Sequence, residues 1–250
     1  MTTQKAYSLT AQPFKEELMR ASAFVAEFIG TFTLILAGAG SIIMAHMMNA
    51  GSASLIAIAL AHGLAIACMA SALGAVSGGH FNPAVTIAML LDKRIKGSNA
   101  VSYIIAQLAG ATVAGLTLCY GFFPGAWEAA QLGTPMLAAS ISPMQGIFIE
   151  AILTFFLVTV IFGTAVDDRA PKVGALFIGL TITMDILFGG PLTGAALNPA
   201  RTFGPAVAGW LAGATTYNPW SGHLVYWIGP ILGACAARVC YANFFRRKVA

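Results

Sequence analysis

Apolar residues dominate this chain in long stretches that are almost free of charge. Six of these stretches approach the ~20 residues that a helix needs to cross the hydrocarbon of a bilayer. They cover about residues 21–45, 53–75, 97–123, 144–166, 173–190 and 221–245. The pattern predicts an all-α membrane protein with six spanning helices. We expect the first span to be retained, because the charged segment 15–20 leads into it in place of a signal-peptide cleavage pattern.

Two further apolar stretches are too short to span a bilayer, and both begin with Asn-Pro-Ala. They run from Asn82 to about Leu91 and from Asn198 to about Trp210. Asparagine caps helices well and proline is tolerated at the first helical position, so each motif predicts a re-entrant half-helix. We expect glycines and one proline to form the turns before them, at Gly78 and Gly79 in one segment and at Gly189, Gly190, Pro191 and Gly194 in the other.

An internal repeat relates the two halves of the chain. The matching residues are Glu27, Thr31 and Phe32 with Glu150, Thr154 and Phe155; Gly78, Asn82, Pro83 and Ala84 with Gly194, Asn198, Pro199 and Ala200; and Tyr103, Ile105 and Gly110 with Tyr226, Ile228 and Gly233. Each half, about 20–121 and 144–245, holds three spans, so the second half is expected to be inverted in the membrane. We therefore expect residues 1–250 to form one domain made of inverted repeats.

Inversion brings the two half-helices in from opposite sides, so that their N-termini meet near mid-membrane. The amides of Asn82 and Asn198 then point into one site, where they can donate hydrogen bonds to a passing water. Each helix N-terminus carries roughly half a positive charge, which repels cations, hydronium included. Arg201 directly follows the second motif, and a cation at membrane depth usually faces a cavity. The alternative for Arg201 is a buried ion pair, for instance with Asp185.

Composition and charge narrow the function classes. The chain is 58% apolar and 9% charged, with a formal charge of +4, whereas roughly a quarter of the residues in a soluble domain are charged. The basic residues lie at segment ends and form no single face, which argues against nucleic-acid binding. By the positive-inside rule they predict cytoplasmic N- and C-termini. These residues are Lys5, Lys15, Arg20, Lys93, Arg94, Lys96, Arg169, Lys172, Arg238, Arg246, Arg247 and Lys248.

The sequence contains no arrangement of residues that is typical of an enzyme active site. We find no nucleophile with a base at useful spacing, no metal-ligand cluster and no phosphate-binding glycine loop. The four cysteines all lie in apolar segments, where packing explains them better than a disulfide framework or a metal site; they are Cys68, Cys119, Cys235 and Cys240. The sequence therefore predicts no enzyme activity, no metal and no cofactor.

Three motifs resemble the major intrinsic protein (aquaporin) family: SGGHFNPAVT at 77–86, GAALNPARTFGPA at 194–206 and AEFIGTF at 26–32. The resemblance covers about residues 20–245. It implies an aquaporin-like channel domain of six spans and two half-helices, and a homotetramer with one pore in each subunit. It also implies passive passage of water across membrane lipid, without protons or ions, through a selectivity filter formed by His62, Ile186, Ala195 and Arg201.

The implied filter departs from the family's usual water-specific pattern, which has a histidine at the Ile186 position opposite an aromatic residue at the His62 position. Its aliphatic wall predicts a wider opening that also passes ammonia, hydrogen peroxide or urea, with glycerol slow. His62 can donate or accept according to its tautomer, and its charge is expected to vary near neutral pH. The His62 and Ile186 pair resembles the tonoplast intrinsic subgroup, but the first span resembles other branches. The cell membrane is favoured as the location.

Other buried polar residues are expected to support the two short segments. Glu27 and Glu150 lie at equivalent depths, where a charge requires partners. We expect each to accept hydrogen bonds from the backbone of a re-entrant loop, with a proton relay as the alternative. His80 is expected to brace its loop, with pH gating as the alternative. For Asp185, the sequence allows either a loop anchor or a partner of Arg201.

Other functions compete with a water channel. A secondary transporter also fits inverted repeats and broken helices, but carriers commonly couple to ions through intramembrane acids, which are few here. A structural junction protein would leave the filter and the paired asparagines unexplained. A glycerol facilitator is disfavoured because several residues resemble the water-channel pattern of the family; they are Thr202, Ala206, Tyr226 and Trp227.

Overall fold

The computed structural model describes the backbone of residues 3–246 and the side chains of residues 18–246. Every regular element in this range is helical. Six helices are long, namely α1 (Thr3–Met47), α2 (Ser54–Ser77), α4 (Gly97–Leu116), α5 (Pro143–Ile161), α6 (Gly174–Thr193) and α8 (Val225–Cys240). Two are short, namely α3 (Pro83–Leu91) and α7 (Pro199–Leu211). Of the charge pattern, the side chains of Lys5 and Lys15 and all of Arg247 and Lys248 lie outside the described residues.

Shorter helical segments connect or extend these helices. Two are single turns of 3-10 helix, η1 (Gly51–Ala53) and η3 (Gln131–Gly133). Three are π-helical turns that continue α4, α5 and α8, namely η2 (Thr117–Phe122), η4 (Phe162–Val166) and η5 (Tyr241–Phe245). The order of elements is thus the same in both halves of the chain, with two long helices, one short helix and a third long helix.

Six segments are long and apolar enough to cross a membrane. They are Leu18–Met47, Gly51–Ser77, Gly97–Phe122, Pro143–Val166, Gly174–Thr193 and Val225–Phe245. This result confirms the predicted all-α membrane fold. The last span begins later than predicted, because residues 221–224 form a turn in which Gly222 has a φ of 64°.

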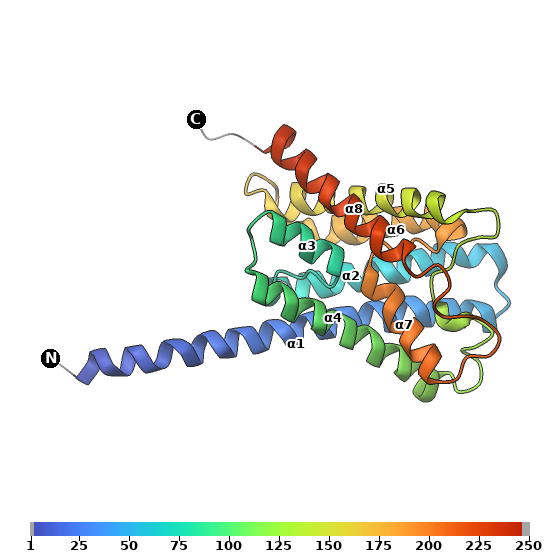
Figure 1. Cartoon of the computed structure of the whole chain (residues 1–250), viewed down its shortest axis with the longest axis horizontal. Helices are drawn as coiled ribbons and strands as arrows, with labels where there is room; N and C mark the ends of the chain where they lie inside the picture. Colours follow the sequence, from blue (N-terminus) through green and yellow to red (C-terminus); the bar gives the residue numbers. More distant parts are fainter. Residues whose placement is uncertain (1–2, 247–250) are drawn as a thin grey trace.

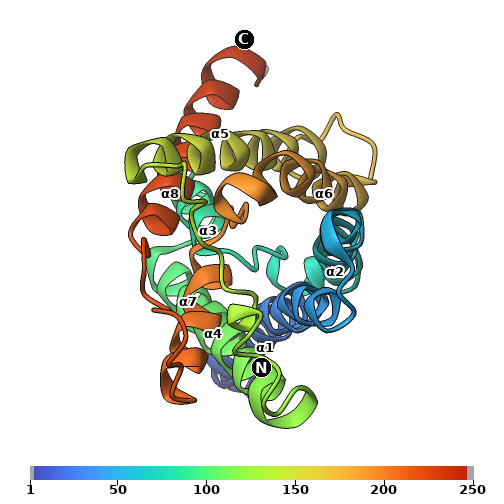
Figure 2. The same ribbon diagram turned by 90° about the vertical axis from the view of Figure 1, so that its right-hand side faces the viewer.

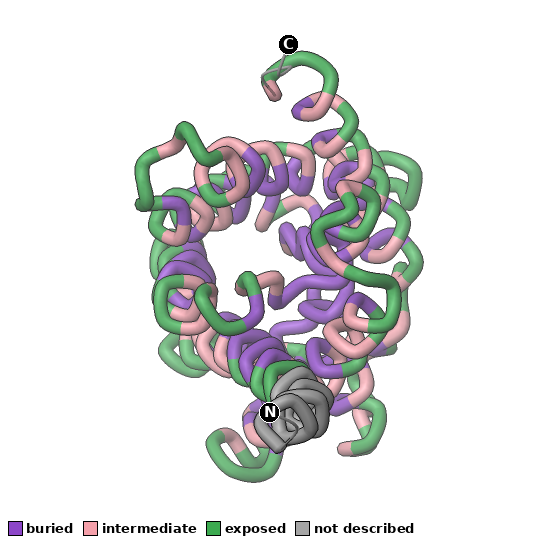
Figure 3. The backbone as a smooth tube through the Cα atoms, turned by 90° about the vertical axis from the view of Figure 1, so that its left-hand side faces the viewer, coloured by how far each residue is buried: buried purple, intermediate pink, exposed green. Residues whose placement is uncertain are grey.

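Both ends of the chain lie at the same end of the helix bundle, at the left in Figure 1. We call this end the terminal face; it carries the loops 92–96 and 167–173. The distal face, at the other end, carries the connections 48–53, 123–142 and 212–224. Figure 2 shows the long helices arranged as a ring, and the irregular segments that precede α3 and α7 pass inside it. Buried residues line the inner side of the ring (Figure 3).

Glycines bring helices into close contact at equivalent places in the two halves. A Cβ added at Gly110 of α4 would lie 2.3 Å from the carbonyl oxygen of Phe28 in α1. A Cβ at Gly233 of α8 would lie 2.0 Å from the carbonyl oxygen of Ala151 in α5. Helix association in lipid depends on such close packing by small residues. The repeated glycines therefore fix the α1–α4 and α5–α8 contacts.

The C-terminal end of α6 differs from the sequence expectation. Gly189, Gly190 and Pro191, which the sequence predicts in the turn, lie inside α6. Gly189 serves close packing, because a Cβ there would lie 2.5 Å from Cδ1 of Leu153. Of the four residues predicted in the turn, only Gly194 adopts a left-handed φ, of 83°, and it ends the helix as a C-cap. Glycine and proline patterns alone do not distinguish a turn from a tight helix contact.

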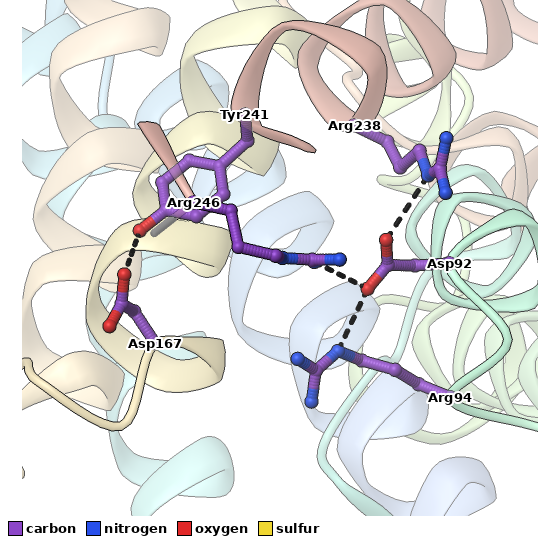
Figure 4. A network of polar contacts seen from close by, with 6 residues as sticks. All are labelled: Asp92, Arg94, Asp167, Arg238, Tyr241 and Arg246. Carbon is purple, nitrogen blue, oxygen red and sulfur yellow. Dashed lines mark hydrogen bonds and ion pairs between the residues drawn. The ribbon is translucent and has the colours of Figure 1, made fainter. Parts of the chain in front are cut away.

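A charged network on the terminal face ties the end of α3 to the end of α8 (Figure 4). Asp92 accepts hydrogen bonds from Nε of Arg94 at 3.0 Å, Nε of Arg238 at 3.1 Å and Nη2 of Arg246 at 2.6 Å. Its side chain is 1% exposed. Burial by itself raises the pKa of the Asp92 carboxyl, but the three arginines outweigh burial and hold this pKa below its usual value. The network fixes the loop between α3 and α4.

Candidate functional site

Both short helices start at asparagine caps. Asn82 and Asn198 have extended backbones, with φ of −157° and −152°. Oδ1 of Asn82 accepts from the N–H of Ala84 at 2.8 Å, and Oδ1 of Asn198 accepts from the N–H of Ala200 at 2.9 Å. The proline of each motif is the first helical residue. The positive ends of the α3 and α7 dipoles are therefore both located at these asparagines.

The two asparagines exchange hydrogen bonds between the halves of the chain. Nδ2 of Asn82 donates to the carbonyl oxygen of Leu197 at 2.9 Å, and Nδ2 of Asn198 donates to the carbonyl oxygen of Phe81 at 2.9 Å. These bonds bring the N-termini of α3 and α7 together. A primary amide has two N–H donors. Each asparagine thus retains one donor for a molecule beside it.

The residues before the two asparagines have unusual backbones. Phe81 and Leu197 have φ of 49° and 55°, in the left-handed region that non-glycine residues seldom adopt. This conformation costs on the order of 1–2 kcal/mol per residue. The peptide N–H of each donates to a buried carboxylate, and the carbonyl of each accepts from the opposite asparagine. Hydrogen bonds on both sides therefore hold each residue in place.

Glu27 of α1 is fully buried and accepts four hydrogen bonds. Oε1 accepts from the hydroxyl of Ser77 at 2.6 Å and from the N–H of His80 at 2.9 Å. Oε2 accepts from the N–H of Phe81 at 2.6 Å and from Nε2 of Gln107 at 2.7 Å. All four partners are donors, and two of them are backbone groups of the segment that leads into α3.

Glu150 of α5 occupies the equivalent place in the second half and is also fully buried. Oε1 accepts from the hydroxyl of Thr193 at 2.7 Å and from the N–H of Ala196 at 2.9 Å. Oε2 accepts from the N–H of Leu197 at 2.8 Å. The bonds of Glu27 are thus repeated, except that Glu150 has no counterpart of the glutamine donor.

Several residues take part in this arrangement whose roles were not predicted from the sequence. Ser77 and Thr193, whose hydroxyls donate to the two glutamates, are the last residues of α2 and α6. The hydroxyl of Tyr103 donates to the carbonyl oxygen of Ser77 at 2.8 Å, and the hydroxyl of Tyr226 donates to that of Thr193 at 2.7 Å. A hydroxyl residue before the turn glycine in both halves was the available signal. Gln107 carried no such signal, because its place in the second half is a proline.

His80 contacts two neighbours beyond its own loop. Thr86 donates its hydroxyl hydrogen to the carbonyl oxygen of Asn82 at 3.0 Å. Nδ1 of His80 lies 3.1 Å from the same hydroxyl oxygen, so we assign the ring nitrogen as the donor. The imidazole also meets the Tyr103 ring edge-on, with centroids 5.3 Å apart. The side chain is thereby fixed between α3 and α4.

A cavity of about 1080 Å³ lies inside the ring of helices. It extends from Arg20 and Lys96 near the terminal face past the two asparagines. Its walls are apolar for the larger part, with polar groups at the terminal face, at the asparagines and beyond them. The four filter residues expected from the sequence all line this cavity; they are His62, Ile186, Ala195 and Arg201. The cavity therefore connects the two asparagines with the four filter residues.

Arg201 and His62 form a buried pair at the wall of the cavity. Nδ1 of His62 lies 2.8 Å from the carbonyl oxygen of Ile58, so it carries the hydrogen of that bond. Nε of Arg201 donates to Nε2 of His62 at 3.1 Å, so this ring nitrogen is the acceptor. The sequence predicts a histidine free to donate, accept or change charge. The structure instead engages both nitrogens of a neutral ring.

Asp185 does not pair with Arg201. Both side chains are buried, and within the described residues Arg201 forms no ion pair with a carboxylate. Oδ2 of Asp185 and Nη1 of Arg201 are buried without a hydrogen-bond partner. The ion pair considered from the sequence is therefore wrong. Among the residues from 18 to 246, no cluster of side chains forms a metal site.

A profile described as Major intrinsic protein matches residues 15–241. The chain belongs to the major intrinsic protein family. Among its relatives in this family, Probable aquaporin TIP3-2 of Arabidopsis thaliana is 40% identical over 234 residues, which cover 88% of this chain and 82% of that one. Aquaporin AqpM of Methanothermobacter marburgensis is 41% identical over 236 residues, covering 87% and 94%.

The fold of this major intrinsic protein is also similar to a solved structure. The X-ray structure of the aquaglyceroporin from Plasmodium falciparum superimposes with a TM-score of 0.79 and 28% sequence identity. The match covers 90% of this chain and 96% of the other. These relatives come from a plant, an archaeon and a parasite.

Proposed function

We propose that this protein is a passive transmembrane channel for water, in which Asn82 and Asn198 orient each molecule at the centre. The exchanged asparagine bonds carry this proposal, because they leave one amide donor on each side at the meeting point of two helix N-termini. A water that accepts both donors points its hydrogens outward and cannot readily pass a proton along the file. The positive helix ends repel cations at the same point. Relatives that are named aquaporins support the same function.

His62, Ile186, Ala195 and Arg201 form the selectivity filter in this proposal. Arg201 supplies fixed donors and a positive charge, while Ile186 and Ala195 leave the opposite wall apolar and small. Ammonia, hydrogen peroxide or urea therefore passes in addition to water. Glycerol is the second candidate solute, since the relative of known structure is an aquaglyceroporin, and its passage through this filter is slow.

The two halves form one channel domain of inverted repeats in this proposal, with Glu27, Glu150 and His80 as braces of the re-entrant segments. Their hydrogen bonds to both segments support this role. The terminal face is cytoplasmic, because its loops carry Lys and Arg, whereas residues 48–53 and 124–143 at the distal face contain none. The protein acts in the cell membrane as a homotetramer and not as an enzyme.

The test uses purified protein in liposomes. Wild type should accelerate osmotic shrinkage over protein-free vesicles in the absence of any ion gradient, while the proton leak stays at the protein-free level. A requirement for an ion gradient would identify a secondary transporter, and absence of water flux would refute the channel. Proton current comparable to water flux would refute the exclusion mechanism.

The same vesicles test the filter. Ile186→His and Ala195→Phe should each reduce urea and hydrogen peroxide flux more than water flux, because each fills the apolar wall. Met144→Leu, at a residue 74% exposed on the outside of α5, is the control and should change neither flux. If wild type excludes every solute except water, or if neither filter variant narrows the range, the wide filter is wrong. Glycerol flux as fast as urea flux would favour the glycerol facilitator.

A further inference from the structure

Gly38 of α1 lies directly against the imidazole of His62 in α2. A Cβ added at Gly38 would lie 2.4 Å from both Cδ2 and Nε2 of that ring, and 2.8 Å from Cε1. Non-bonded heavy atoms in folded proteins do not lie this close together, and a close-packed interior leaves little spare volume to relieve the overlap. Any side chain at position 38 must therefore move the ring.

The direction of that movement follows from what holds the imidazole. Its Nδ1 is bonded to the carbonyl oxygen of Ile58, one turn earlier in α2, while its Nε2 accepts from Arg201. A methyl group at Gly38 strikes the edge that carries Nε2. The ring must then turn away from α1 toward the cavity that His62 lines, and Nε2 leaves the reach of the arginine.

Loss of this contact also affects the arginine. Nη1 of Arg201 is already buried without a partner, and a displaced His62 removes the acceptor of Nε as well. Unpaired donors on a buried cation are costly, so the guanidinium is expected to move toward another acceptor or toward water in the cavity. Both the movement of the imidazole and that of the guanidinium narrow the cavity beside the filter.

We propose that Gly38 is a specificity-determining position, which sets the width of the filter by leaving room for the His62 ring beside α1. Gly38 itself touches no solute; it acts as a positioning residue through His62 and Arg201. This inference rests on the proposed function, because it takes these two residues to be part of the filter.

A double-mutant cycle in liposomes tests the inference. Water and urea permeability are measured for wild type, Gly38→Ala, His62→Ala and the double variant. Gly38→Ala should lower the ratio of urea to water permeability several-fold. In the His62→Ala background the same substitution should leave the ratio unchanged, because the methyl group then meets no ring. If urea does not pass wild type, water permeability itself is the readout.

Gly40→Ala is the matched control on the same helix. A Cβ at Gly40 would come no closer than 3.3 Å to any neighbour, Cδ2 of Leu118. It should leave the ratio unchanged in both backgrounds. If Gly38→Ala does not fold, recovery of folded protein in the Gly38→Ala/His62→Ala variant supports the inference, and continued loss overturns it.

The outcomes separate this inference from the proposed function. An equal effect of Gly38→Ala in both backgrounds overturns the inference and assigns Gly38 to helix packing alone. A folded Gly38→Ala protein with wild-type permeabilities also overturns it, while the filter stands if His62→Ala widens the solute range. If wild type carries no water, or if His62→Ala changes nothing, the filter assignment fails and the inference with it.

Discussion

Replacing Glu150 by glutamine and by alanine should separate a structural brace from a proton relay. The carboxylate accepts one backbone N–H on each oxygen, from Ala196 on Oε1 and from Leu197 on Oε2. The hydroxyl of Thr193, its third partner, can rotate to suit a new neighbour, whereas the two backbone donors cannot. Glutamine therefore leaves one backbone N–H unpaired, and alanine leaves two.

The structure gives the expected size of each effect. A buried donor left without a partner costs about 1–3 kcal/mol. We expect Glu150→Gln to lower the free energy of unfolding by about 1–3 kcal/mol and Glu150→Ala by about 2–6 kcal/mol. The upper end of the second range reaches the lower end of the stability of a whole domain, roughly 5–15 kcal/mol. Glu27, which also accepts one backbone N–H on each oxygen, should show the same order.

Thermal unfolding of the purified variants in detergent provides the measurement, and water and proton flux are then recorded for the variants that remain folded. Phe148→Leu in the same helix is the control, because Phe148 is 67% exposed on the outside of the bundle. Equal stability of wild type and Glu150→Gln would refute the brace. A stable glutamine variant with altered proton flux would establish the relay instead.

Two further substitutions should report on the terminal and distal faces. Asp92→Asn should lower the unfolding temperature, since three arginines lose the carboxylate charge and one of its two acceptor oxygens. Because the folded pKa of Asp92 is depressed, its contribution to stability is present above about pH 4 and is lost as the pH falls further. A variant with the wild-type acid profile would contradict this. Gly194→Ala should lower the unfolding temperature more than Gly51→Ala. Both glycines have a left-handed φ, of 83° and 57°, but an added Cβ at Gly194 would lie 2.9 Å from Cα of Pro135, whereas Gly51 has open space around it. Equal unfolding temperatures would show that the contact with Pro135 does not matter.

The sequence predicts most of the architecture because the membrane imposes simple requirements. Span length and charge depletion identify the six long helices, and Asn-Pro-Ala identifies the starts of α3 and α7. The end of α6 could not be predicted, because Gly189 serves a contact with Leu153 that only the packed helices reveal. Local patterns report on local geometry, and long-range packing can reassign them.

The candidate site was less predictable than the fold. The repeat directed attention to Glu27 and Glu150, but Gln107 donates to Glu27 across 80 positions and has no counterpart in the second half. The pairing of His62 with Arg201 joins residues 139 positions apart. The hydrogen bonds at both ring nitrogens of His62 and the space that Gly38 leaves for this ring cannot be predicted from residue types. Both depend on how α1, α2 and α7 pack together.

The exchanged amide bonds also bear on how the chain is made. Asn82 requires an acceptor that lies 115 positions later in the chain, the carbonyl oxygen of Leu197. While the ribosome has delivered only the first three spans, that acceptor does not exist, and a buried amide without a partner is unfavourable. The segment before α3 is therefore expected to reach its final conformation only after the segment before α7 has entered the bilayer. A nascent chain that stops short of Leu197 would insert its early spans and still lack an ordered centre.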